Sequence, residues 1–365
     1  MTRSHAPLCH PPPAETDPVR VPIAHASRRS LLLTTGRLGA GLAAGVIAAP
    51  VRHVRAAGGP ITVGLLIAGR IDDRGFMQAG FGGFERAREM LGVKTRLIDG
   101  VKPQKPLLAA ALTTLAESGA DLVIAHGGQN NEAAREVSAR FPGTRFAVTQ
   151  GGVVGPNLAS YEVLQEQSAY LAGVLAASTT RSGVVGHMSG IRVKPGLKGR
   201  AAYVAGVRAT NPDVKVLTNF SGNQDDNALS RRVALAQIAG GADVIFTMLN
   251  AGRTGAIDAC REKGAKQIGN VVDWVAAVPD VFVGSAIADV SIGVFNAIRD
   301  VSSGRFEGGV IRRIGLEAPE AVKLALAADV PAAVRERIAK VAADIREGRV
   351  AVPDAYDGPE FATPA

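Results

Sequence analysis

Cysteine and aromatic residues are scarce in this chain of 365 residues, which has two cysteines, one tryptophan and 4% aromatic residues in all. Cys9 lies in a segment that we expect to be removed, so the mature chain keeps only Cys260 and cannot form an internal disulfide. Cys260 falls on the apolar side of a predicted helix, which favours buried packing over thiol reactivity.

Excess charge of one sign is also small once the N-terminal segment is set aside. The chain has a formal net charge of +8, but seven arginines and only Glu15 and Asp17 precede residue 57, which leaves +3 for the rest. No Lys/Arg cluster interleaved with aromatic residues is present. We therefore expect no nucleic-acid partner.

The N-terminal segment has the layout of a secretory signal peptide. The run Ser27–Leu33 carries paired arginines ahead of a weakly apolar Gly/Ala/Leu stretch that ends near Ala49, and Ala56 ends a plausible cleavage motif. This pattern predicts a twin-arginine signal over residues 1–56 and a periplasmic mature protein. An uncleaved membrane anchor is the alternative, but Arg37 at mid-span would cost about 2.5–3.5 kcal/mol on insertion.

From Pro60 onward, strand-like and helical patterns alternate. Residues 61–68 form a continuous apolar run of strand length, and residues 76–91 have helical spacing. Continuous apolar strands that alternate with helices predict parallel sheets covered on both faces, and hence an α/β fold.

The same pattern recurs at an offset of 122 residues. Gly119-Ala120-Asp121 maps onto Gly241-Ala242-Asp243, and the strands on either side also match. The sequence therefore predicts two Rossmann-like lobes with parallel sheets, joined by a three-strand hinge. We expect the first lobe to span residues 57–158 and 287–308 and the second lobe residues 159–286 and 309–360. The hinge strands are expected at residues 157–161, 284–288 and 309–314.

Ligands of open parallel sheets bind beyond the carboxyl ends of the strands, so two facing lobes predict a cleft lined by strand-to-helix loops. Polar, glycine and aromatic residues of these loops are the predicted ligand contacts: Asp73, Phe76, Gly127, Gln129, Gln150, Gln224, Asn250, Gly252, Asp273, Trp274 and Ser285.

Several of these residues have a second interpretation. Phe76 and Trp274 could sandwich a flat ligand, but Phe76 could equally begin a helix and pack on its strand. Asp72 and Asp73 are expected to be a helix-capping pair rather than metal ligands, because no His or third carboxylate lies nearby at ligand spacing. Asp226 is a further predicted cap.

Enzymatic motifs are lacking. The turn after the first strand does not have the glycine pattern of a dinucleotide site, and neither a phosphate-binding loop nor a Gly-x-Ser-x-Gly elbow occurs. His126 and His187 lie near strand ends without a nucleophile, which favours a structural role. We expect a protein that is not an enzyme and that needs neither a cofactor nor a metal.

Over about residues 60–318 the chain resembles the basic membrane protein and purine-nucleoside receptor family of ABC-transporter substrate-binding proteins, which have the type I periplasmic binding protein fold. The resemblance rests on the order and spacing of short motifs: Asp72–Phe76, Phe141-Pro142, Pro156–Ser160, Tyr170–Gly173, Gly252–Gly255 and Phe306–Gly309. It implies capture of a small ligand by hinge closure, delivery to an ABC permease, and a monomer.

The departures from the family pattern fall in the expected pocket. Gln224 stands where the family has a stacking aromatic residue, Val271 where it has a ribose-binding Asp, Ala288 where it has a Lys, and Ile67 where an acidic residue often contacts the base. A purine base or nucleoside-like heterocycle is the first ligand that the resemblance implies. A sugar or another small polar metabolite, or a role as a periplasmic ligand sensor, stays open.

Overall fold

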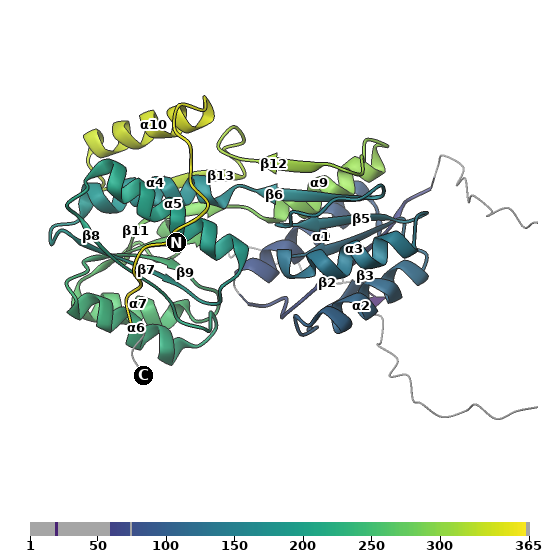
Figure 1. Cartoon of the computed structure of the whole chain (residues 1–365), viewed down its shortest axis with the longest axis horizontal. Coiled ribbons are helices and arrows are strands. Elements are labelled where there is room, and N and C mark those ends of the chain that lie inside the picture. Colours follow the sequence, from purple (N-terminus) through teal and green to yellow (C-terminus); the bar gives the residue numbers. More distant parts are fainter. Residues whose placement is uncertain (1–18, 21–58, 74, 363–365) are drawn as a thin grey trace, which may run out of the picture.

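The computed structural model describes residues 19–20, 59–73 and 75–362, which form two lobes lying side by side along the long axis of the molecule (Figure 1). Each lobe is built on one sheet covered by helices on both faces, which confirms the predicted α/β class. The predicted signal peptide lies outside the described residues except for β1 (Val19–Arg20). Of the helices that the structure describes, none is long and apolar enough to cross a membrane.

The first lobe contains a sheet in which all neighbouring strands are parallel. Its further elements are β2 (Thr62–Ile67), α1 (Phe76–Leu91), β3 (Lys94–Ile98), α2 (Lys105–Glu117), β4 (Leu122–His126), η1 (Gly128–Asn130), α3 (Asn131–Arg140), β5 (Arg145–Thr149), β6 (Leu158–Val163), α9 (Ser291–Ser302) and β12 (Ile311–Ile314). The strand order is β1-β3-β2-β4-β5-β6-β12. Helices α1 and α9 cover one face through Phe84 and Val294, and α2 and α3 cover the other through Leu112 and Val137.

The second lobe repeats this plan with one antiparallel edge strand. Its elements are α4 (Gln165–Thr179), β7 (Val184–Ser189), α5 (Lys194–Thr210), β8 (Lys215–Phe220), α6 (Asn227–Ala239), β9 (Val244–Met248), α7 (Arg253–Lys263), β10 (Lys266–Val271), α8 (Trp274–Ala277), β11 (Phe282–Ala288), β13 (Val322–Leu326) and α10 (Ala332–Arg346). The order is β13-β11-β10-β9-β7-β8, and β13 is the antiparallel strand. Helices α4, α5 and α10 pack on one face, and α6 and α7 pack on the other.

The repeated Gly-Ala-Asp motif plays the same structural part in both lobes. Gly119 and Gly241 have φ values of 79° and 100°, the left-handed region that glycine adopts without strain. The carboxylate of Asp121 then accepts the backbone N–H of Thr62 at the start of β2, and that of Asp243 accepts the N–H of Ser182 just before β7. The motif thus ties the start of β4 to β2 in the first lobe and the start of β9 to β7 in the second.

The chain crosses between the lobes a few residues later than predicted. β6 pairs with β5 and with β12 in the first sheet, so residues 159–163 and 311–314, expected in the second lobe, complete the first. Residues 287–288, expected in the first lobe, belong to β11 of the second sheet. The backbone groups of these strands are satisfied by their ladders, so the lobe changes only where strand pairing ends.

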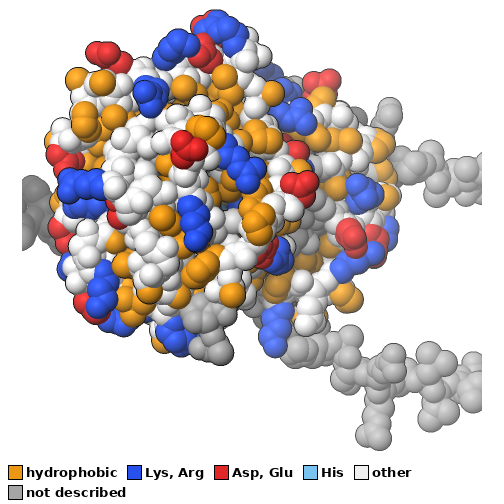
Figure 2. Space-filling view, turned by 60° about the vertical axis from the view of Figure 1, so that its left-hand side comes forward, with side chains coloured by type: hydrophobic (Ala, Val, Ile, Leu, Met, Phe, Trp, Pro, Cys, Tyr) orange, Lys and Arg blue, Asp and Glu red, His pale blue; other side chains and the backbone are white. Residues whose placement is uncertain are grey.

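The C-terminal residues beyond α10 run back across the second lobe (Figure 1). Tyr356 lies between Arg200 and Arg208, and Phe361 N–H donates to the carbonyl of Thr218 on the edge strand β8. Figure 2 shows basic and acidic side chains scattered over the face in view rather than gathered into one field.

Candidate functional site: the interlobe cleft

A pocket of about 490 Å³ lies where the two lobes meet. Its walls come from α1, from the segment after β10, from the crossing between β11 and α9, and from the region where β13 begins: Ala79, Gly82, Arg86, Val271, Val272, Asp273, Ile287, Asp289, Ser291, Glu320 and Lys323. Its volume is typical of small-molecule sites. The carboxyl ends of β10 and β11 contribute to it, as the parallel-sheet rule requires.

The pocket combines apolar walls with charged groups of both signs. Val271 and Ile287 supply apolar surface, while two cations and three carboxylates supply donors and acceptors. Arg86 is held in place because it donates to Ser291 Oγ at 3.3 Å and packs over the Phe295 ring at 4.9 Å. Such a lining suits a compact molecule that carries both hydrogen-bond donors and acceptors.

The backbone is strained at one pocket residue. Val271 has a φ of 70°, and the only other non-glycine residue with positive φ in the described part of the chain is Gln150, with 53°. The two residues lie in equivalent places, because Gln150 follows β5 in the first lobe and Val271 ends β10 in the second. A β-branched residue in this region is a genuine outlier, and strain of this kind clusters at ligand sites.

Asp73 and Asn250 join the two lobes directly. Asn250 Nδ2 donates to Asp73 Oδ2 at 3.0 Å, and Phe76 N–H donates to Asn250 Oδ1 at 3.4 Å. Asp73 also accepts the N–H groups of Gly75, Met77 and Gln78 at 2.9–3.0 Å, which confirms Asp73 as a helix cap. Asp72, the other member of the predicted capping pair, is exposed and pairs with Arg70 instead. The described lobes are therefore in contact across the cleft, with the start of α1 as the meeting point.

A second interlobe contact is a buried ion cluster beside the first crossing. Lys198 of α5 donates to Glu162 of β6 at 2.9 Å and contacts Glu166 of α4. Burial opposes the charge on Lys198, but the two carboxylates outweigh it and hold the pKa of its ammonium above the ordinary value. Burial also raises the pKa of Glu166, and Lys198 offsets part of that rise. The cluster links both lobes at the hinge.

Phe76 is stacked on His126 rather than open to a ligand on both faces. The two ring centroids are 4.3 Å apart with an interplanar angle of 25°. His126 Nε2 is 2.9 Å from the carbonyl of Phe76, which only accepts, so Nε2 carries the proton and Nδ1 accepts from Thr149 Oγ1 at 2.7 Å. Burial lowers the pKa of His126 to about 4, so the ring is neutral at pH 7.

Trp274 is turned against the core of its own lobe. Its ring stacks on buried Phe282 at 5.7 Å, and the guanidinium of Arg253 lies 4.6 Å from the ring centroid. Nε1 donates to the carbonyl of Asn270 at 3.1 Å. Gly269 leaves the space, since a Cβ there would lie 2.5 Å from the indole. This packing on the core contradicts the predicted Phe76/Trp274 sandwich.

A family model described as ABC transporter substrate-binding protein, PnrA-like, matches residues 61–351. The chain belongs to this family.

Relatives of known structure or curated name agree with this family. Basic membrane protein A1 of Borrelia garinii subsp. bavariensis is 26% identical over 263 residues, covering 70% of this chain and 77% of that protein. Transcriptional activator protein Med of Bacillus subtilis is 22% identical over 247 residues, covering 68% and 77%. An ABC transporter solute-binding protein from Aeropyrum pernix K1 superposes with a TM-score of 0.71 at 22% identity, covering 80% of this chain and 94% of that one.

Three of the four positions at which the resemblance implies ligand contacts carry apolar residues here. Ile67, Val271 and Ala288 are at most 5% exposed. Their side chains cannot supply the charge-assisted hydrogen bonds that the resemblance implies for an acidic residue or a lysine.

Several predicted contacts hold the loops in place. Gln150 exchanges two hydrogen bonds with the backbone of Val163, at 2.9 and 2.5 Å. Ser285 Oγ accepts the N–H groups of Trp274 and Val275 at 2.8 and 3.1 Å. These side-chain atoms position the loops of the PnrA-like cleft rather than face it.

Among the remaining predicted contacts, Gln224 and Gln129 contact backbone atoms of their own lobes, whereas Asp273 lines the pocket. The carbonyl of Gln224 accepts the N–H groups of Asn250 and Gly252 at 3.0 Å, and Gln129 Nε2 lies 3.4 Å from the carbonyl of His126, next to Gly127. Asp273 caps α8 through the N–H of Ala276 at 3.2 Å and also lines the pocket. Of all the predicted contacts, Asp273 alone is among the pocket-lining residues.

The sequence did not predict the pocket residues of α1, nor those that follow β12, where the chain crosses between the lobes for the third time. Ala79, Gly82 and Arg86 lie three and four residues apart and therefore share one face of α1. This spacing is visible in the sequence and could have predicted them. Glu320 and Lys323 had no such signal, because only the return of the chain through β13 brings them to the cleft. Arg253, at the start of a predicted helix, is buried within its own lobe, and burial lowers its pKa to about 9.

Proposed function

We propose that this chain is the ligand-capturing component of an ABC uptake system, which closes its two lobes on a small molecule and presents it to a membrane permease. The observation that carries the proposal is the pocket of about 490 Å³ lined from both lobes. The Asp73–Asn250 contact supports closure, because a ligand that touches both walls adds to an interaction that already favours the closed form.

The ligand that the family resemblance favours is a purine base or nucleoside-like heterocycle. Val271 and Ile287 offer apolar surface to a ring face, and Arg86, Lys323 and the pocket carboxylates offer partners for ring nitrogens and carbonyl oxygens. The apolar side chain of Val271 removes the ribose contact that the resemblance implies, which favours a free base over a nucleoside.

A sugar or another small polar metabolite is the second candidate. It is favoured by the aromatic rings themselves, since Trp274 packs against Phe282 and Arg253 and one face of Phe76 is stacked on His126. A ligand that does not depend on stacking fits this lining better than one that does.

A sensor that uses the same lobes is a further candidate, because one relative bears the name transcriptional activator protein Med. The twin-arginine pattern of residues 27–33 favours export and uptake instead. In this proposal the mature chain, from residue 57, acts in the periplasm as a monomer without catalysis. Light scattering after size exclusion tests the monomer.

The test is a thermal-shift screen of residues 57–365 against nucleobases, nucleosides, sugars and amino acids. Ligand at 100 times its Kd stabilises the folded state by about 2.7 kcal/mol. Each hit is then titrated calorimetrically into Gly82→Trp, which places a bulky side chain at a pocket-lining position where a Cβ meets nothing within 4 Å. Gly143→Trp, equally uncrowded but outside the pocket lining, is the matched control.

The outcomes separate the candidates. A purine-base hit that Gly82→Trp abolishes and Gly143→Trp keeps supports the proposed ligand. A sugar hit with the same behaviour supports the second candidate. A hit that Gly82→Trp leaves unchanged places the ligand outside this pocket and contradicts the proposal.

A further inference from the structure

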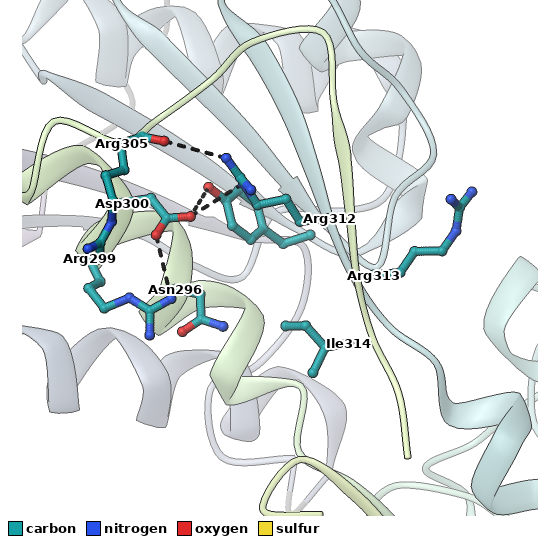
Figure 3. A pocket seen from close by; sticks show the side chains of 8 residues that line it. Asn296, Arg299, Asp300, Arg305, Arg312, Arg313 and Ile314 are labelled. Atoms are coloured by element: carbon teal, nitrogen blue, oxygen red, sulfur yellow. Dashed lines mark hydrogen bonds and ion pairs between the residues drawn. The ribbon is translucent and has the colours of Figure 1, made fainter. Parts of the chain in front are cut away.

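A second pocket, of about 380 Å³, lies in the first lobe between α9 and β12 and shares no lining residue with the interlobe pocket (Figure 3). It is rich in arginine, and its lining residues are Tyr161, Asn296, Arg299, Asp300, Arg305, Arg312, Arg313 and Ile314. None of these residues contacts the ligand in the proposed capture.

Asp300 organises the cations of this pocket. Its carboxylate is 8% exposed and accepts a hydrogen bond from Tyr161 Oη at 2.9 Å. Arg299 Nη2 lies 3.5 Å and Arg312 Nε 3.4 Å from its oxygens. Burial and the Asp300 charge raise the pKa of Tyr161, so the phenol stays protonated and keeps donating. Asp300 is thus an acceptor shared by one phenol and two guanidinium groups.

Positive charge exceeds negative charge around Asp300. Figure 3 shows Arg299, Arg305 and Arg312 around this carboxylate, whereas Arg313 points away from them; Arg313 lies 3.6 Å from Glu162. Among the residues that the structure describes, no carboxylate lies within ion-pair distance of Arg305. Glu307 reaches only Arg312, at 3.7 Å, and is 66% exposed. One buried carboxylate therefore faces three arginines.

Donor capacity is also left over. Arg312 Nε is buried and has no hydrogen bond within the described part of the chain, although it lies at ion-pair distance from Asp300. Arg312 Nη2 donates to the carbonyl of Arg305 at 3.4 Å. The side chains of Arg299 and Arg312 are 45% and 38% exposed, so both remain accessible to a ligand. Planar guanidinium groups that converge from a helix, a turn and a strand match the several oxygens of a tetrahedral anion.

We propose that this pocket binds a phosphate group, with Arg299, Arg305 and Arg312 as its donors. A phosphate supplies hydrogen-bond acceptors for the arginine N–H groups that have no partner among the described residues. Its negative charge also compensates the positive charge of the three arginines that Asp300 alone does not neutralise. By bridging α9 and β12, the phosphate also holds β12 in place, and it is after this strand, at Ile314, that the chain passes to the second lobe for the last time. The group comes either from free phosphate or from the headgroup of a membrane lipid.

The first arm of the test is calorimetric titration of inorganic phosphate into residues 57–365 at constant ionic strength. Arg305→Gln is the diagnostic variant, because Arg305 is exposed and its substitution breaks no ion pair among the described residues. We expect phosphate binding to weaken about tenfold in this variant. Arg232→Gln, an exposed arginine on α6 of the other lobe, is the matched control and should bind as the wild type does.

The second arm replaces free phosphate by vesicles of phosphatidylglycerol in a sedimentation assay. Vesicles of zwitterionic phosphatidylcholine, which have no net charge, are the control. If the protein binds inorganic phosphate and Arg305→Gln weakens that binding, the result supports a site for free phosphate. Sedimentation with phosphatidylglycerol alone, weakened by the same variant, supports the site with a lipid headgroup. Absence of binding in both arms, or equal binding by wild type and Arg305→Gln, overturns the proposal.

Discussion

Asn250 of the second lobe donates to the carboxylate of Asp73 at 3.0 Å, and that carboxylate is at the same time the N-terminal cap of α1 in the first lobe. Closure of the lobes and the start of a helix are therefore tied to one side chain. A motion that opens the cleft breaks the Asn250 contact but leaves the cap intact, so the first lobe does not lose stability when it opens.

Replacing Asn250 by alanine should loosen the closed form without unfolding either lobe. The variant loses the hydrogen bond to Asp73, worth about 1 kcal/mol, and the longer one from the N–H of Phe76. Affinity for a ligand that requires closure should therefore fall at least about fivefold. Titration calorimetry with a hit from the screen measures this. Asn223→Ala is the control, because the side chain of Asn223 bonds within its own loop, to the N–H of Asp225. Equal loss in both variants would contradict the interlobe role of Asn250.

The sequence predicted the caps and the repeat because their signals are local. Asp73 and Asp226 precede helical patterns, and the Gly-Ala-Asp motif occurs at one spacing in both halves. Trp274 misled the prediction because a tryptophan after a strand end has the same local sequence whether it faces a ligand or the core. Only the space left by Gly269 and the position of Phe282 decide between the two. Glu320 and Lys323 reach the pocket through long-range topology, which no local pattern encodes.

The buried cluster at the hinge should contribute strongly to stability. Lys198→Met leaves Glu162 and Glu166 buried without their main cation, which should cost roughly 3–5 kcal/mol in the free energy of unfolding. Lys194→Met is the control, because Lys194 is 55% exposed and 4.0 Å from Glu162, and it should cost less than about 1 kcal/mol. Urea unfolding measures both, and similar costs for the two lysines would refute the assignment.

The two buried histidines predict a loss of stability in mild acid. Burial lowers the pKa of His126 to about 4 and that of His187 to about 3, so both are neutral in the folded state while an unfolded histidine gains a proton below about 6.5. Their contribution is fully present above pH 6.5 and is lost as the pH falls towards 4. Because the pKa of His126 differs by about two and a half units between the states, its share is roughly 3 kcal/mol.

Urea unfolding of the wild type and of His126→Gln at pH 7, 6, 5 and 4.5 checks this dependence. The variant should be less stable at pH 7 and should show a shallower fall towards pH 4.5. Parallel curves for the two proteins would mean that His126 titrates alike in the folded and unfolded states.

Trp274 should act on stability rather than on ligand binding. Trp274→Ala removes the stacking on Phe282 and should cost roughly 3 kcal/mol, whereas Trp274→Phe should keep most of the packing. Neither variant should change the affinity for a hit from the screen by more than about twofold. Titration and urea unfolding are measured on the same variants. If affinity falls while stability is unchanged, Trp274 contacts the ligand after all.

Capture requires the two lobes to close on a ligand in the pocket between them. Spin labels on Arg135→Cys of α3 and Arg232→Cys of α6 report the distance between the lobes, because both positions are exposed and Cys260 is buried. Pulsed electron spin resonance on residues 57–365, with and without a hit from the screen, measures that distance. We expect the ligand to shift the distribution to one narrow, closed population, and Asn250→Ala to broaden it when the ligand is absent. A distribution that the bound ligand does not change would contradict capture by closure.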